Sequence, residues 1–182
     1  MAKIVSTERA PSPVTAVNEA ERGQRMNARI FAIVRIIAGV LWLTNTGWKT
    51  PPDFGALYNY TKGAVEHPIV PPYSWLVENQ ILPHIGIFGW MVLLTEAMLG
   101  ACLILGLATR FWALVAVAQS IAIGLSVALL PGEWPWSYYL MVAVHLAIFA
   151  SAAGRTWGLD ELLRPVLRTR QGRLPQLLLR AT

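Results

Sequence analysis

Hydrophobic residues along this chain gather into four long stretches, at about residues 30–47, 85–107, 111–130 and 136–153. Each stretch comes near the ~20 residues that a helix needs to cross a hydrocarbon core of ~30 Å. The segments between them are polar or rich in proline. The pattern therefore predicts an all-α membrane protein, built as a bundle of four transmembrane helices.

The N-terminal segment differs from the stretch that follows it. Residues 1–28 are polar, and Ser12 followed by Pro13 could cap and start a helix that Gly23 would weaken. We interpret this arm as a surface helix or a partly ordered segment before a membrane domain at 29–155. It has no apolar core followed by a cleavage site, so we expect the first span to act as its own insertion signal.

Two further segments are expected at the membrane surface. Residues 48–84 form an outer loop with many prolines and aromatic residues, which predicts short helices lying on the outer surface. Residues 156–182 are basic and their apolar residues recur at helical spacing, which predicts an amphipathic cytoplasmic helix on anionic lipid. A docking site for a cytoplasmic protein is the alternative for this tail.

Composition narrows the class of protein. Hydrophobic residues make up 55% of the 182 residues and charged residues only 14%, against about a quarter charged in soluble domains. The single cysteine, Cys102, excludes an internal disulfide and a thiol-pair relay. The three histidines lack metal-ligand spacing, so we expect no metal site.

The distribution of positive charge favours a membrane orientation and argues against nucleic acid as a partner. Five basic residues precede the first stretch, Arg110 lies between the second and third, and six follow the fourth, whereas only Lys49 and Lys62 lie in the outer loop. Under the positive-inside rule, this asymmetry places both termini in the cytoplasm.

Each stretch contains one strongly polar residue. These are Arg35, Glu96, Gln119 and His145. At ~1.5 Å rise per residue, all four fall in the inner half of the bilayer, with Tyr138 roughly 10 Å further out. Polar groups inside a membrane are expensive and usually face a partner or a cavity.

The helical repeat of about 100° per residue shows which neighbours share a face with each polar residue. Two of the four lie on helix faces that carry small residues. Arg35 shares its face with Gly39, and Glu96 shares its face with three glycines, which suits close packing between membrane helices. The glycines beside Glu96 are Gly86, Gly89 and Gly100. We expect Arg35 and Glu96 to form a buried ion pair. Cys102 lies about 240° around the helix from Glu96, so we expect it to face lipid or another subunit.

Two interpretations of the polar residues stay open. They can hold four helices in register through buried pairing and hydrogen bonds. They can also form a proton relay or a quinone headgroup site, because a quinone needs donors for its two carbonyl oxygens and a proton route, and together Arg35, His145, Gln119 and Glu96 could supply both. The same residues are compatible with both interpretations.

Several short motifs, taken in order, resemble one known family. Arg35 with Gly39 precedes the run Trp48-Lys49-Thr50-Pro51-Pro52-Asp53-Phe54. Glu96 with Gly100 leads to Leu105-Gly106-Leu107-Ala108-Thr109-Arg110, and Gly154-Arg155 leads to Gly158-Leu159-Asp160. Over about residues 29–163 this order is similar to the DoxX and DoxD family of small four-helix membrane proteins.

The resemblance implies an integral subunit of a redox-associated complex in a prokaryotic cytoplasmic membrane. DoxD is the small subunit of a thiosulfate:quinone oxidoreductase, so quinone is the expected cofactor or substrate and no covalent cofactor is expected. The chain is then not an enzyme alone, and its partners are lipid and other membrane or cytoplasmic subunits. A non-catalytic accessory subunit of a larger respiratory or photosynthetic complex is the alternative, and a small-solute transporter is the remote one, since four spans are few.

Overall fold

The computed structural model describes residues 13–182, with side-chain exposure from residue 17 onward, and the described part of the chain is helical without strands. Its first helix, α1 (Pro13–Thr44), begins in the segment expected as a separate arm and runs unbroken into the first apolar stretch. A single interior glycine such as Gly23 costs a helix only about 1 kcal/mol. The Arg25–Glu21 pair at 2.8 Å offsets part of that cost. Ser12, the expected cap, lies outside the described residues.

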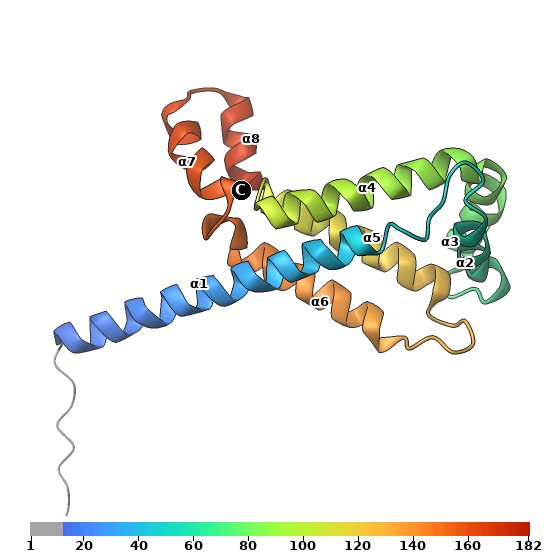
Figure 1. Cartoon of the computed structure of the whole chain (residues 1–182), viewed down its shortest axis with the longest axis horizontal. Coiled ribbons are helices and arrows are strands. Elements are labelled where there is room, and N and C mark those ends of the chain that lie inside the picture. The colour runs from blue at the N-terminus through green and yellow to red at the C-terminus, as the bar shows by residue number, and fades with distance from the viewer. Residues whose placement is uncertain (1–12) are drawn as a thin grey trace, which may run out of the picture.

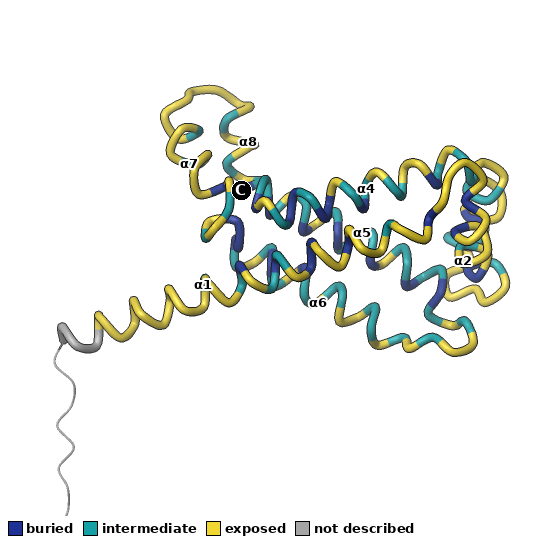
Figure 2. Tube along the Cα trace, viewed as in Figure 1, coloured by how far each residue is buried: buried dark blue, intermediate teal, exposed yellow. Residues whose placement is uncertain are grey.

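Three more helices complete the bundle. These are α4 (Ile85–Leu105), α5 (Thr109–Val127) and α6 (Trp136–Ser151). Helix α1 packs mainly against α4, and α5 packs mainly against α6. Figure 1 shows the four helices side by side, with the first half of α1 extending beyond them, and Figure 2 shows that this half is mostly exposed from residue 17 onward.

The α1 and α4 helices cross where Gly39 meets Gly100. A Cβ atom built on Gly39 would lie 2.8 Å from the Gly100 carbonyl oxygen, and one on Gly100 would lie 2.8 Å from the Gly39 oxygen. Backbones can approach this closely only where side chains are absent. This crossing fixes the register of the two antiparallel helices.

The segment just before α4 is helical over a greater length than the sequence predicted. Where an outer loop was expected up to residue 84, α3 (Pro71–Leu76), a π-helical turn η1 (Val77–Ile81) and a 3₁₀ turn η2 (Leu82–His84) lead directly into it. Pro83 has no amide hydrogen and so cannot continue regular α-helical bonding at this point. The irregular turns absorb that break while the chain remains helical.

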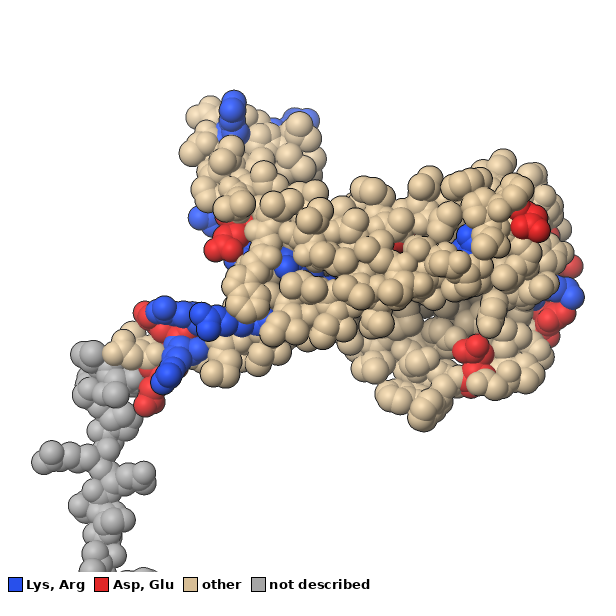
Figure 3. Space-filling view, viewed as in Figure 1, with Lys and Arg blue, Asp and Glu red and all other residues tan. Residues whose placement is uncertain are grey.

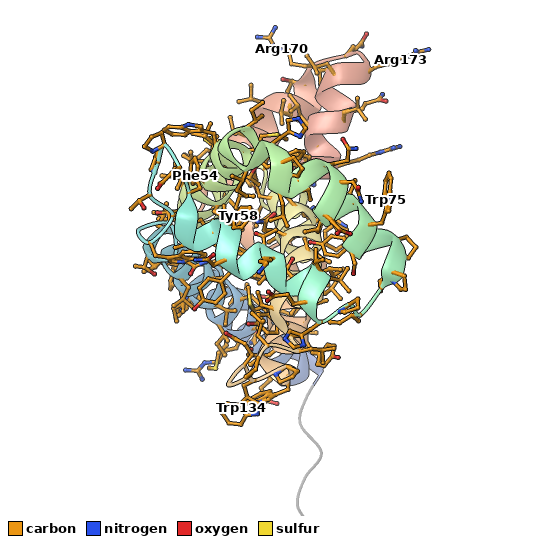
Figure 4. All side chains as sticks on the ribbon, turned by 90° about the vertical axis from the view of Figure 1, so that its right-hand side faces the viewer. Phe54, Tyr58, Trp75, Trp134, Arg170 and Arg173 are labelled. Atoms are coloured by element: carbon orange, nitrogen blue, oxygen red, sulfur yellow. The ribbon has the colours of Figure 1, made fainter. Side chains whose placement is uncertain are left out.

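The other part of the outer segment forms a cap over one end of the bundle. Helix α2 (Gly55–Glu66) lies across that end. Figure 4 looks onto this end of the bundle and labels Phe54 and Tyr58 at the start of α2. Phe54 is fully buried against Gly89 of α4, where a Cβ would collide with its ring. Further along α2, a Cβ on Gly63 would lie 2.6 Å from the Ser126 carbonyl oxygen of α5. The cap is therefore anchored at both ends.

At the opposite end of the bundle the chain forms a pair of short helices. The 3₁₀ turn η3 (Ala153–Arg155) leads to α7 (Leu159–Thr169) and α8 (Arg173–Ala181), which pack together and project sideways from the bundle (Figure 1). In Figure 3 the middle of the bundle is almost free of charged side chains, which gather at its two ends. An uncharged band between charged ends is typical of a protein that crosses a membrane.

Three helical segments are long and apolar enough to cross a membrane. They are residues 17–44, 71–105 and 109–127, whereas α6 is apolar but has only 16 residues. At 1.5 Å per residue α6 is about 24 Å long, short of the ~30 Å hydrocarbon core. The prediction of four spans thus rests on α6, and the surface location of α2 also stays a prediction.

Candidate functional site

A large cavity lies inside the bundle on the side of the α2 cap. Its volume is about 1090 Å³ and its lining is mostly apolar, with side chains from α1, α2, α4, α5 and α6. Pockets for small organic molecules are typically about 300–1,000 Å³ and mostly apolar, with a few polar groups that fix orientation. The polar groups at this cavity include four of the five predicted cluster residues, Glu96, Gln119, Tyr138 and His145.

An ion pair at the cavity joins two residues from different parts of the chain. Lys49 Nζ lies 2.6 Å from Glu96 Oε2, and both side chains are almost fully buried. The ammonium also donates to the Asn45 carbonyl at 2.9 Å, and Gln119 Nε2 donates to Glu96 Oε1 at 3.4 Å. Glu96 therefore receives partners from the turn after α1 and from α5. A buried carboxylate and ammonium need such compensation.

His145 already uses both of its ring nitrogens. Trp42 Nε1 donates to His145 Nε2 at 2.9 Å, and His145 Nδ1 lies 2.6 Å from the Met141 carbonyl oxygen. An indole N–H can only donate and a carbonyl can only accept, so the hydrogen must be on Nδ1. This arrangement makes His145 a neutral link between α6 and α1. A ligand could bond to Nε2 only by displacing the indole.

Two tyrosines lie further toward the cap. Tyr138 donates to Glu133 Oε2 at 2.5 Å, and Tyr73 lies 2.9 Å from Ser126 Oγ and donates to the Ala122 carbonyl at 3.0 Å. Both line the cavity. Their hydroxyls hold the cap-side walls together, and their rings add to the apolar lining.

The expected Arg35–Glu96 ion pair is wrong. Glu96 pairs with Lys49, while the Arg35 guanidinium donates to the Trp157 carbonyl at 3.0 Å near the other end of the bundle. The crossing of Gly39 with Gly100 explains the separation, because Arg35 and Glu96 each lie one turn from it in opposite directions. Eight residues of helix rise place them about 12 Å apart along the axes.

Arg35 instead belongs to a second buried group, the Arg35 cluster, formed by Arg35, Gly106, Thr109, Gly154, Gly158 and Asp160. Arg35 and Asp160 are both fully buried. A Cβ at Gly106 or Gly158 would collide with Arg35 Nη1. Arg35 Nε and Nη1 have no hydrogen-bond partner among residues 13–182. The contacts of the cluster join α1 to the turn after α4 and to the segment before α7.

Asp160 supplies the N-terminal cap of α5 from a distant part of the chain. Its Oδ1 accepts from the Ala108 amide at 2.7 Å and its Oδ2 from the Thr109 amide at 2.9 Å. The Asp160 amide in turn donates to the Gly106 carbonyl at 2.9 Å. The first amides of a helix have no internal partners and favour a negative charge. The motifs around Gly106 and Asp160 therefore form one structural unit.

The structure differs from the sequence-based expectations for two residues of α4. Cys102 is only 5% exposed, so within this chain it is buried and does not face lipid or another subunit as expected. Of the four predicted packing glycines, Gly86 has no close neighbour, with the Pro52 carbonyl oxygen 4.0 Å from a built Cβ.

Sequence reasoning missed Lys49 and Trp42 as site residues. Lys49 was assigned to the outer loop and counted only for orientation, although it sits in the run of residues 48–54 on which the resemblance was partly based. Trp42 lies seven residues after Arg35 and three after Gly39, and this helical spacing was the available signal that it shares their face and points into the bundle. Both touch the polar residues that the sequence did identify.

The comparisons with known proteins agree with the resemblance found in the sequence. The family model described as TQO small subunit DoxD matches residues 67–178, which is more than half of the chain. The matched region contains α3 to α7 and the Asp160 cap, and it excludes Lys49 and Arg35. No curated protein and no solved structure matches the chain.

Proposed function

Because the chain belongs to the DoxD family and is a multi-pass membrane protein, we propose that it is the integral-membrane subunit of a quinone-dependent oxidoreductase complex. It has the role of a binding subunit that completes an enzyme together with other chains. The observation that carries this proposal is the Lys49–Glu96 pair at a large, mostly apolar cavity.

The cavity residues match what a quinone headgroup requires. A quinone offers two carbonyl acceptors, and Lys49 Nζ and Gln119 Nε2 are donors at the cavity. Reduction to hydroquinone takes two electrons and two protons. In our proposal a partner subunit supplies the electrons, and Glu96 passes protons toward the oxygen that Lys49 binds. His145 and Tyr138 shape the site, and Arg35 stays outside it.

The membrane topology is part of the proposal. We propose four spans, with α6 as the fourth, held at its cap side by the interfacial residues Trp134 and Trp136, whose rings contact edge to face. The excess of basic residues on α1, α7 and α8 supports a topology in which both termini lie in the cytoplasm of a prokaryotic cell and α2 lies on the outer surface of its inner membrane.

A second candidate function has its own structural support. The first half of α1 extends beyond the bundle and is exposed, with Val17 and Met26 each more than half accessible. A protruding helix of this kind is a surface for another subunit, which favours a non-catalytic accessory role in a larger complex. Native mass spectrometry after gentle solubilisation distinguishes a partnered chain from a monomer or homo-oligomer.

Titration of the purified protein with a decyl-tailed benzoquinone tests the quinone proposal. We expect the double variant Lys49→Met with Glu96→Gln to bind roughly ten- to a hundredfold more weakly, because a charged hydrogen bond contributes about 1.5–3 kcal/mol. The matched control is Lys62→Met, which removes an exposed lysine of α2 paired with Glu66. Unchanged binding by the double variant would reject the proposal.

A further inference from the structure

The cavity has an opening between α1 and α6. On the end of α1 and the turn that follows it, Leu41, Thr44, Asn45 and Trp48 line the cavity, and on α6 the residues Ser137, Leu140, Met141 and Val144 do so. The α6 set has the spacing i, i+3, i+4, i+7 and forms one stripe along that helix, and the first set forms a second stripe that continues from the last turn of α1. Leu41 is 63% exposed and Leu140 49% exposed although both line the cavity. The stripes are therefore open to the outside.

Two aromatic contacts frame this opening. At its inner edge the bond from Trp42 to His145 joins α1 to α6, with ring centroids 5.8 Å apart. At its outer edge Trp48 stacks at a tilt on Tyr60 of α2, with centroids 5.3 Å apart. Beyond the inner edge α1 and α6 diverge toward the cap end (Figure 1), and Figure 3 shows the surface recessed in that region.

Access to the cavity from the water side, past α2, is more restricted than access through the side opening. Phe54 fills the space above Gly89 and Gly63 packs onto the Ser126 backbone, so both ends of α2 are fixed to the bundle. Opening the cap would expose the fully buried Phe54 side chain to water, which is unfavourable for a large apolar residue. The side opening requires no such movement.

Resting on the quinone proposal, we propose that the gap between α1 and α6 is a lateral portal that takes the hydrocarbon tail of a membrane-dissolved quinone. The headgroup lies at Lys49 and Glu96, and the tail passes between the Leu41 and Leu140 stripes into the bilayer. Most of the surface around the opening is uncharged, with one acidic side chain beside it (Figure 3), and this suits an apolar occupant. The substrate class is thus a quinone with a tail, delivered from lipid.

Photolabelling in proteoliposomes tests the portal. The probes are an alkyl-tailed benzoquinone with a diazirine in its tail and an alkyl diazirine without the quinone ring. We expect the quinone probe to label residues 41–48 and 137–144, and an excess of unlabelled quinone to suppress that labelling. The double variant Leu41→Trp with Leu140→Trp should slow labelling about tenfold by overfilling the gap. The matched control, Leu94→Trp with Ile121→Trp, alters exposed residues outside the cavity lining and should label at the wild-type rate.

The outcomes separate the portal from the quinone proposal. Labelling of the two stripes by the ringless probe alone supports the portal and rejects quinone binding. Labelling by the quinone probe at the wild-type rate in the Leu41→Trp, Leu140→Trp variant, or labelling confined to α2, overturns the portal while quinone binding stands. Labelling of neither stripe by either probe overturns the portal.

Discussion

Lys49 reaches from the turn after α1 to place its ammonium 2.6 Å from the carboxylate of Glu96 in the middle of α4. Both groups are shielded from solvent, and the pair lines the cavity together with Gln119. The contact ties the outer segment to the bundle and supplies a charged donor and a proton carrier at one point. Both the structural and the functional interpretation of the buried polar residues depend on this pair.

The pairing can be tested by removing its charges singly and together. We expect Glu96→Leu to lower the free energy of unfolding by about 3–5 kcal/mol, because it leaves the Lys49 ammonium buried without a partner. The double change Lys49→Leu with Glu96→Leu should cost less than Glu96→Leu alone. Unfolding in mixed micelles measures both. A double variant that loses the sum of the two single effects would contradict the pairing.

Asp160 is expected to stabilise α5 through its two amide contacts. Replacing it by alanine should cost about 2–3 kcal/mol, since two buried amides at the start of the helix lose a charged acceptor. The neighbouring Glu161 is exposed, so Glu161→Ala is the matched control and should change little. Thermal unfolding monitored by circular dichroism measures both variants, and equal melting temperatures would refute the distant cap.

Gly106 is expected to tolerate alanine less well than Gly132. Both have positive φ, at 65° and 88°, so both substitutions share the backbone strain. Only at Gly106 would the new methyl collide with Arg35 Nη1, whereas Gly132 has open space. We expect Gly106→Ala to be the more destabilising by on the order of 2 kcal/mol. Similar melting temperatures would show that the Arg35 cluster can relax.

The α7 and α8 pair is expected to bind anionic lipid. Leu162, Val166, Leu174 and Leu177 are each more than half exposed, and basic residues lie beside them. In nanodiscs with anionic lipid, Leu162→Asp with Leu177→Asp should abolish the amide exchange protection of both helices. Gln171→Asp with Gln176→Asp adds the same charge at exposed polar positions and should retain most of the protection. Equal protection in anionic and zwitterionic lipid would favour protein docking.

The sequence predicted the all-helical class and four of the polar residues that line the cavity. Long apolar stretches and polar residues within them are strong local signals. The sequence also placed Gly39 and Gly100 on interior faces, where the structure brings them into contact. Helical phase identifies a face, but it does not fix how two antiparallel helices are shifted along each other. That shift separates Arg35 from Glu96, and it depends on contacts between distant segments.

Lys49 and Asp160 show a second limit of the same reasoning. Lys49 follows the end of α1, and its long side chain turns back into the bundle, so its position in the loop did not indicate its burial. Asp160 caps a helix that begins 51 residues earlier. Capping patterns in sequence are local, so a cap supplied from so far away gives no pattern at the helix it stabilises.

The most direct test of the central claim is the amount of quinone that stays with the protein purified gently from its own membrane. Extraction and chromatography should give about one quinone per chain for the wild type and for Lys62→Met. The folded double variant Lys49→Met with Glu96→Gln should retain almost none. Equal quinone content in all three proteins, or none in the wild type, would contradict a quinone site at Lys49 and Glu96.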